Sequence, residues 1–238
     1  MFFISGLKRS GSTWSYNVAR IFLESVSREE KIFMGYVGEG RDVDEFLARE
    51  AGSFKTSLLK FHVPTPRIFN LVAKGVARNI FTFRCPLEAL ASEIDFFKLP
   101  FNQALMNILN GLHSMEIWRR QPGTLIVKHE DITSNPVREI KRIANHFEIS
   151  AHDSIIQYCA NETSYENIKR KAELLANESP EKLTRAGAYT YDPVTLLHIG
   201  HVRNNSSRDW RSVLQKEQIE IAIESLKSWL PEDFDPNR

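Results

Sequence analysis

The opening stretch, MFFISGLKRSGSTW, constrains the fold more than any other part of the chain. The apolar run at 2–5 has the length of a buried strand, and a glycine- and serine-rich turn leads from it into the helical pattern of 12–26. A turn of this kind aims main-chain N–H groups and the positive end of a helix dipole at an anion. We therefore expect a strand, loop and helix unit that binds a phosphate-like group.

Residues 6–13, GLKRSGST, match the phosphate loop of nucleoside triphosphatases except at one position. In those enzymes a lysine follows the second glycine and reaches the β- and γ-phosphates, whereas this chain has Ser12. Positive charge stands instead at the apex of the loop, as Lys8 and Arg9. The hydroxyls expected to add donors are those of Ser10, Ser12 and Thr13. Three interpretations stay open here: an altered triphosphate site, a chance turn, and a loop for a different phosphate ligand.

Composition limits the classes of partner. The chain has 238 residues, 42% hydrophobic and 26% charged, which predicts one globular domain over 1–238. A net charge of +1 gives no general attraction to nucleic acid or to an anionic membrane, so we expect neither as a partner and look for a local anion site. Cys85 and Cys159 are too few for a disulfide framework and have no metal-ligand spacing. We expect a cytoplasmic protein with no metal.

Short apolar runs alternate with helical patterns along the first half of the chain. The expected strands are 2–5, 57–63, 79–83 and 124–128, and the expected helices are 12–26, 86–97, 134–147, 151–161, 164–176 and 214–228. The residues expected on the apolar face of the first helix are Trp14, Val18, Ile21, Phe22 and Val26. The alternation predicts an α/β fold, a three-layer α/β/α arrangement with a central, mostly parallel sheet. Residues 178–207 have little periodicity and are interpreted as a long functional loop or lid.

The loop KRSGSTW resembles PKSGTTW, the loop of the cytosolic-type sulfotransferases that use 3′-phosphoadenosine 5′-phosphosulfate (PAPS). In that family the loop binds the 5′-phosphosulfate and the tryptophan helps to hold the adenine. The resemblance assigns these roles to Arg9, Ser10, Gly11, Ser12, Thr13 and Trp14. Arg9 stands where the family has lysine, with Lys8 beside it.

A second segment, FRCPLEALASEIDFF, resembles the family's R-N-P-x-D-x-x-x-S element for the 3′-phosphate. Arg84 and Ser92 have the required spacing, which puts a guanidinium at a strand end and a hydroxyl two turns into the next helix. The resemblance therefore implies that both bind the 3′-phosphate. HEDI at 129–132 is similar to the family's Y-E-D-L.

Two weaker matches complete the nucleotide site. HVRNNSSRDWRSVL is similar to the family's R-K-G-x-x-G-D-W-K-x-x-F, which implies that Arg203 binds the 3′-phosphate; Asn204 and Asn205 replace the Lys-Gly pair. TSYENIK is similar to T-S-F-x-x-M-K, which lines the adenine in the family and implicates Thr163 and Tyr165.

KFHVP at 60–64 resembles the family's K-[ST]-H-L-P, whose histidine is the general base. The resemblance gives that role to His62, which would take the proton from the attacking hydroxyl or amine. Lys60, Arg9 and Lys8 are the candidates to stabilise the leaving 5′-phosphate. Arginine keeps the charge of the family's lysine but cannot donate a proton, so proton donation would fall to Lys8 or Lys60.

The remaining histidines have no motif. His113 and His146 lie in helical patterns and are interpreted as structural or solvated, whereas His198 and His201, beside Arg203, are candidates to reach the acceptor pocket.

The sequence thus predicts an enzyme that moves a sulfuryl group from PAPS, with no metal, to a hydroxyl or amine of a small-molecule acceptor. A natural product such as an alkaloid is one such acceptor. The alternatives are a P-loop kinase of a small metabolite and a non-catalytic nucleotide-binding protein of the same fold. The acceptor and the oligomeric state are not specified by the sequence.

Overall fold

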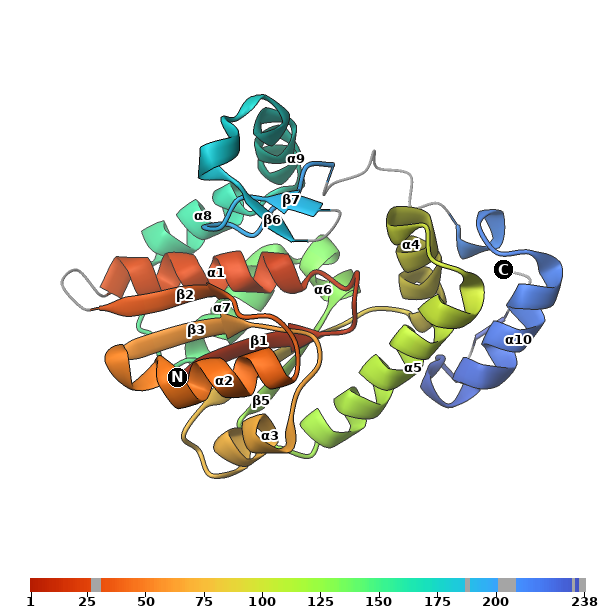
Figure 1. Cartoon of the computed structure of the whole chain (residues 1–238), viewed down its shortest axis with the longest axis horizontal. Coiled ribbons are helices and arrows are strands. Elements are labelled where there is room, and N and C mark those ends of the chain that lie inside the picture. The colour runs from red at the N-terminus through yellow and green to blue at the C-terminus, as the bar shows by residue number, and fades with distance from the viewer. Residues whose placement is uncertain (27–30, 187–188, 201–208, 233, 236–238) are drawn as a thin grey trace.

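A computed structural model gives the fold for residues 1–26, 31–186, 189–200, 209–232 and 234–235 (Figure 1). Its strands are β1 (Phe2–Gly6), β2 (Ile32–Tyr36), β3 (Thr56–Lys60), β4 (Arg78–Phe83), β5 (Thr124–Lys128), β6 (Thr184–Ala186) and β7 (Tyr189–Tyr191). Its α-helices are α1 (Ser12–Val26), α2 (Arg41–Arg49), α3 (Pro66–Ala73), α4 (Pro86–Phe97), α5 (Phe101–Trp118), α6 (His129–Ser134), α7 (Pro136–His146), α8 (Asp153–Glu162), α9 (Tyr165–Leu174) and α10 (Lys216–Leu226).

The first five strands form one parallel sheet in the order β2-β3-β1-β4-β5 among the residues described. β1 lies at the centre, with Phe3 opposite Leu59 of β3 and Asn79 of β4. All five strands run in one direction, so their carboxyl ends meet at one edge of the sheet, where open α/β sheets bind ligands. The predicted parallel α/β sheet is confirmed.

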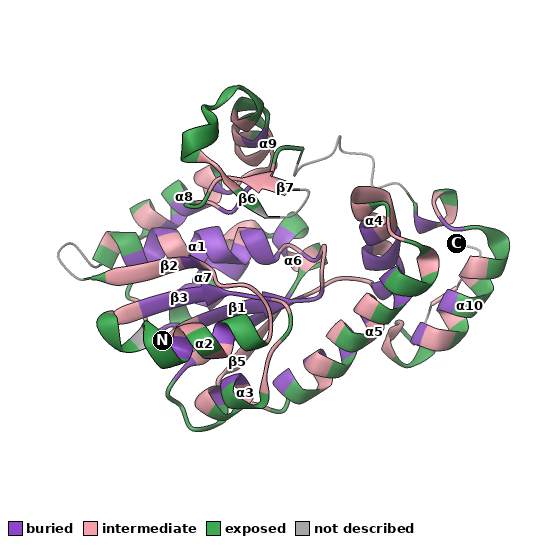
Figure 2. Ribbon diagram, in the orientation of Figure 1, coloured by how far each residue is buried: buried purple, intermediate pink, exposed green. Residues whose placement is uncertain are grey.

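Consecutive residues of each strand point to opposite faces of the sheet, and each face carries its own core. Phe3 and Phe81 pack with α2, α3, α4 and α5, whereas Ile4 and Ile80 pack with α1, α7 and α8. Figure 2 shows the central strands and most of α1 as buried. Helices therefore cover both faces of the sheet, and α10 packs beside α4 and α5 (Figure 1).

α1 spans the predicted residues and is buried along most of its length, on more than one side. Val18, Ile21 and Phe22 belong to the core, and Trp14 is half-buried. Val26, however, is 52% exposed, so its assignment to the apolar face was wrong. It is the last residue of the helix.

Three further parts of the sequence interpretation need correction. β3 ends at Lys60, three residues before the predicted end at 63. β2 was not predicted, although Ile32, Phe33 and Met34 are apolar; the run is short, contains Gly35 and is mostly half-buried. The stretch 178–207 holds the antiparallel hairpin of β6 and β7, two strands too short to leave a periodic signal. Within the described ranges, no helix is long and apolar enough to cross a bilayer.

Candidate active site

A cavity of about 1730 Å³ opens at the carboxyl edge of the sheet. Residues that follow the parallel strands line this cavity. Lys8 and Arg9 follow β1, Glu39 follows β2, His62 follows β3 and Arg84 follows β4. The predicted residues that line the cavity are Lys8, Arg9, Gly11, Ser12, Thr13, Trp14, Lys60, His62, Arg84, Ser92, Thr163 and Tyr165. The predictions for His201, Arg203, Asn204 and Asn205 lie outside the described residues.

The apex of the loop between β1 and α1 is tied to α4. Arg9 has a φ of +64° and Gly11 a φ of +94°, both in the left-handed region, which only glycine adopts without cost. The Arg9 Nε donates a hydrogen bond of 3.2 Å to the Ser92 Oγ, and the guanidinium lies 4.0 Å from the centre of the Phe96 ring. Two of the predicted nucleotide-binding side chains, Arg9 and Ser92, are thus in direct contact.

Ser10 is the one described member of the predicted site that is absent from the cavity wall. It is fully buried, and its Oγ lies 2.9 Å from the Thr82 carbonyl oxygen, 2.7 Å from the Thr82 Oγ1 and within hydrogen-bonding distance of the Leu7 carbonyl oxygen. A Cβ on Gly6 would come within 2.0 Å of the Thr82 Oγ1, so glycine alone allows this close approach. The Ser10 hydroxyl therefore braces the loop against β4 and is not available as the expected anion donor.

Lys60 and His62 lie side by side under the loop. The His62 Nδ1 is 3.0 Å from the Gly6 carbonyl oxygen, which can only accept, so Nδ1 carries the ring proton. Nε2 then holds the ring's lone pair and accepts from the Lys60 Nζ at 3.3 Å. The arrangement presents a neutral imidazole nitrogen beside an ammonium group.

Burial sets the protonation of this pair. It lowers the pKa of Lys60 to about 8, an effect that Glu39 opposes and Arg9 reinforces. Burial, followed by the charge of Lys60, holds the pKa of His62 well below 6.5. At neutral pH, His62 is therefore uncharged and Lys60 is mostly protonated.

Two acidic residues missed by the sequence interpretation support this side of the site. The Glu93 carboxylate on α4 is fully buried, which raises its pKa; its Oε1 accepts 2.7 Å from the Asn107 Nδ2 and lies 4.0 Å from the Lys8 Nζ. The Glu39 Oε2 accepts from the main-chain N–H of His62 at 2.8 Å. The sequence did contain a signal for each residue: Glu93 is an acid within an apolar helical pattern, and Glu39 is an acid between two glycines.

The part of the cavity wall that the sequence predicts to bind the nucleotide contains Arg84 and Thr163. The Arg84 Nε and Nη2 lie 2.8 and 2.6 Å from the Glu88 Oε2, one helical turn away. Thr163 is buried, and its hydroxyl donates to the Cys159 carbonyl oxygen at 2.8 Å. His129, at the start of α6, also lines this wall, and burial followed by the charge of Arg84 lowers its pKa. The sequence interpretation gave His129 no role, although it begins the HEDI match.

The segment after β7 is fixed over α1. The Asn17 Nδ2 donates to the Thr195 carbonyl oxygen at 2.8 Å, and Leu196 and Leu197 are buried. His198 follows and lines the cavity, as the sequence interpretation allowed. Burial, then the charges of Lys60 and Arg9, lowers its pKa to about 4, so His198 is neutral.

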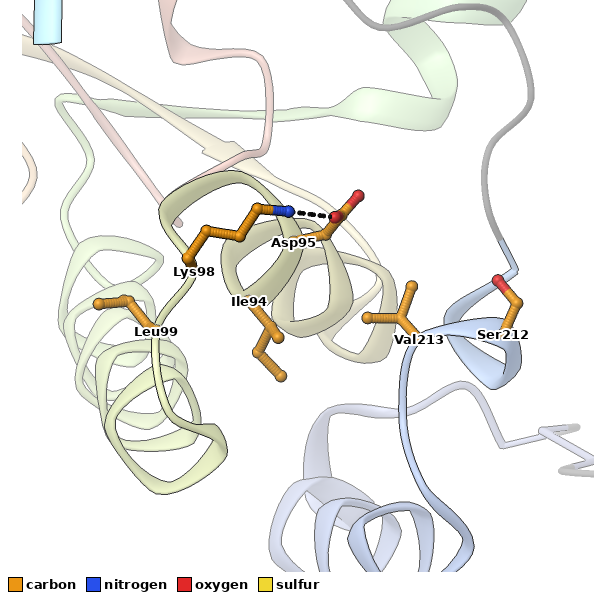
Figure 3. Close-up of a pocket in the computed structure, with 6 residues that line it drawn as sticks. All are labelled: Ile94, Asp95, Lys98, Leu99, Ser212 and Val213. Atoms are coloured by element: carbon orange, nitrogen blue, oxygen red, sulfur yellow. Dashed lines mark hydrogen bonds and ion pairs between the residues drawn. The ribbon is translucent and has the colours of Figure 1, made fainter.

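A smaller hollow of about 430 Å³ adjoins the cavity between α4 and the turn Trp210–Ser212 (Figure 3). Its wall consists of Ile94, Asp95, Lys98, Leu99, Ser212 and Val213. Asp95, Lys98 and Val213 line both spaces, and the Lys98 Nζ is 2.9 Å from the Asp95 Oδ1. The hollow is therefore a side branch of the same cavity.

In open parallel α/β sheets, a cationic loop between a strand and the N-terminus of the next helix is a common place for anionic ligands to bind. The family described as the sulfotransferase domain matches residues 1–232, and the chain belongs to that family. The expected sulfotransferase is confirmed at this level. Comparison with curated protein sequences gives no match.

Solved structures share the fold. A mouse sulfotransferase, SULT7A1, complexed with PAP, has a TM-score of 0.63 and 15% identity over 98% of this chain and 85% of its own. Retinol dehydratase in complex with androsterone and the inactive cofactor PAP has a TM-score of 0.60 and 16% identity over 100% of this chain and 83% of its own. Retinol dehydratase with retinol and PAP gives 0.62 and 15%, over 98% and 82%. At these identities the likeness shows the fold.

Proposed function

We propose that the protein transfers a sulfuryl group from PAPS to a hydroxyl or amine of a small-molecule acceptor, in line, with His62 as general base. One observation carries the proposal: a neutral His62 Nε2 lies 3.3 Å from the Lys60 Nζ, beside the anion-binding loop. A base beside a cation suits the attack of a hydroxyl on a group that leaves as an anion. Membership of the sulfotransferase domain family supplies the class of reaction.

The charges of the cavity fit a donor with anions at two separate positions. Lys8 and Arg9 belong to the loop after β1, Lys60 ends β3, and Arg84 follows β4. We assign the first three to the 5′-phosphosulfate and Arg84, with Ser92, to the 3′-phosphate. Aromatic surface for the adenine is available from Trp14 and Tyr165, while Thr163 lines the same wall. The bound donor supplies the electrophilic sulfuryl group.

The protein's own groups divide the proton and charge transfers. His62 accepts the acceptor's proton at Nε2 while the Gly6 carbonyl oxygen holds its Nδ1–H, which fixes the ring. Lys60 and Arg9 stabilise the charge that develops on the 5′-phosphate. A pKa of about 8 lets Lys60 also donate a proton, whereas Arg9 cannot.

The acceptor side is a mixture of aromatic and apolar groups. Tyr36, Phe97, Tyr191 and Leu197 line it. Retinol dehydratase binds androsterone or retinol in its complexes, which supports an acceptor with an extended apolar body. Cys85 and Cys159 are free thiols, which supports our expectation of a reducing, cytoplasmic setting.

Thermal unfolding in the presence of nucleotides tests the donor. We expect 3′-phosphoadenosine 5′-phosphate (PAP) with EDTA to raise the Tm, and ATP with Mg²⁺ to have little effect. Stabilisation by ATP with Mg²⁺ alone would support a kinase and overturn the proposal.

A screen of phenols, alcohols and amines with labelled PAPS then tests transfer and identifies the acceptor. The His62→Ala variant serves as the paired sample. PAP binding without transfer to any acceptor would favour a non-catalytic nucleotide-binding protein.

A further inference from the structure

Glu39 occupies the turn between β2 and α2, and glycines on both sides give that turn its shape. Gly38 has a φ of +85° and Gly40 a φ of +52°, values that side chains disfavour. The Gly40 N–H donates to the Val63 carbonyl oxygen at 3.0 Å, so the turn lies directly against the chain that leaves β3. Glu39 is thereby held next to His62.

The Glu39 carboxylate accepts main-chain hydrogen bonds that a neighbouring strand would otherwise accept. β3 ends at Lys60, so the main-chain N–H groups just beyond it need other acceptors. The Glu39 Oε2 accepts from the N–H of His62 at 2.8 Å and from that of Val63, and its Oε1 accepts from the Tyr36 hydroxyl at 2.7 Å. One side chain thus fixes the main chain that carries the proposed base.

Glu39 also bears on the charge of Lys60, whose side chain is almost fully buried. The groups that face Lys60 are Arg9 from the loop, Tyr36 from β2, Glu39 from the turn, His62 from its own chain and His198 from the segment after β7. Burial and Arg9 lower the pKa of Lys60, and Glu39 raises it. Loss of the Glu39 charge would leave the lowering effects unopposed.

We propose that Glu39 is the positioning residue of this centre: its length holds His62 in place, and its negative charge keeps the neighbouring Lys60 protonated. The proposal rests on the proposed function for its effect on catalysis. The coupling between Glu39 and Lys60 holds for the free protein and can be measured without any reaction.

Two substitutions separate length from charge. Glu39→Gln keeps the length and an oxygen that can accept both N–H groups, but it removes the charge. Glu39→Asp keeps the charge and shortens the side chain by one methylene. The matched control is Glu45→Gln, the same chemical change on the exposed side of α2. Thermal unfolding confirms that each variant folds.

Competitive labelling with acetic anhydride at different pH values reports the titration of Lys60, because only the neutral amine reacts. Mass spectrometry of the Lys60 peptide gives the midpoint, expected near pH 8 in the unaltered protein. In Glu39→Gln we expect a midpoint lower by about one unit, the usual effect of losing one opposite charge. Glu39→Asp and Glu45→Gln should leave it in place. An unshifted midpoint in Glu39→Gln overturns the charge part.

Transfer kinetics with PAPS test the length part. We expect Glu39→Asp to lower kcat by about 10- to 100-fold with an unchanged alkaline limb, because His62 is displaced. In Glu39→Gln the alkaline limb should move to lower pH by the same amount as the labelling midpoint. Full kcat in Glu39→Asp overturns the length part. If the unaltered protein neither binds PAP nor transfers, the proposed function fails, while the labelling result still decides the coupling.

Discussion

The two ends of the cavity differ in how firmly their charged groups are held. At the loop end, which contains Lys60, His62 and Ser10, buried or partly buried hydrogen bonds to main-chain atoms or neighbouring side chains fix the groups. At the nucleotide end, Arg84 is paired with Glu88, a side chain 38% exposed to solvent. The groups at the loop end are fixed in the free protein, whereas in the function that we propose an anion would replace Glu88 as the ionic partner of Arg84.

This difference suggests a division of labour between chemistry and binding. A group that reacts must be held in one geometry before the substrate arrives, because misplacement by about 1 Å can cost 100-fold in rate. A group that only binds can change partners, because the charge-assisted hydrogen bonds to the new anion replace those that it gives up. Substitutions at the loop end should therefore change kcat, and those at the nucleotide end should change affinity.

The largest expected effect comes from the loop end. His62→Ala should lower kcat by about 10²- to 10⁴-fold, because no group remains to take the acceptor's proton. Isothermal calorimetry should find PAP affinity close to that of the unaltered protein. Loss of PAP binding in this variant would contradict the division between the two ends, because it would show that His62 contributes to nucleotide binding.

Arg84→Ala tests the other end. We expect it to weaken PAP binding by about 10- to 100-fold, because it removes charge-assisted hydrogen bonds to the 3′-phosphate. Adenosine 5′-phosphosulfate, which lacks that phosphate, is the control ligand and should bind the variant and the unaltered protein equally. Equal weakening of both nucleotides would place the effect of Arg84 elsewhere.

The pH dependence of kcat/KM should reflect the loop end. His62, with a pKa well below 6.5, must be neutral to act as a base, so the rate should rise with pH in the acidic range and then level off. Lys60, with a pKa of about 8, must be protonated, so the rate should fall above that value by about tenfold per pH unit. A stopped assay from about pH 5 to about pH 10 measures both the acidic rise and the alkaline fall of kcat/KM. A profile flat through pH 8 would contradict the role of Lys60.

The smallest expected effect is a change in PAP affinity when the partner of Arg84 is altered. Glu88→Gln removes the ionic partner of Arg84 and a negative charge near the proposed 3′-phosphate position. PAP affinity should therefore rise by about threefold, with kcat unchanged, as calorimetry and initial rates can check. A fall in affinity would mean that Glu88 orients Arg84 rather than competes for it.

Much of the fold could be predicted because its elements are local and strongly patterned. The runs at 2–5 and 79–83 are buried on both faces of a parallel sheet, so most of their residues are apolar. β2 was not predicted, because it is an edge strand with mostly half-buried residues and contains Gly35. The hairpin of β6 and β7 has only three residues in each strand, and its pairing is not encoded by alternation.

The site divides in a similar way. Lys60, His62 and Arg84 belong to segments that resemble a known family, and they lie at strand ends that parallel topology brings together. Glu39 and Glu93 could not be found in this way, because their roles arise from contacts between distant parts of the chain. Only the folded chain brings Glu39 to the main-chain N–H of His62.

β4 links the two ends of the cavity through covalent geometry. Thr82 holds the loop through the Ser10 hydroxyl, and Arg84 follows two residues later, directly after the strand ends at Phe83. Two residues of extended chain span about 7 Å, a length that thermal motion barely changes. The strand therefore acts as a ruler: an insertion or deletion between Thr82 and Arg84 would change which spacing of anions the cavity accepts, even with every binding side chain retained.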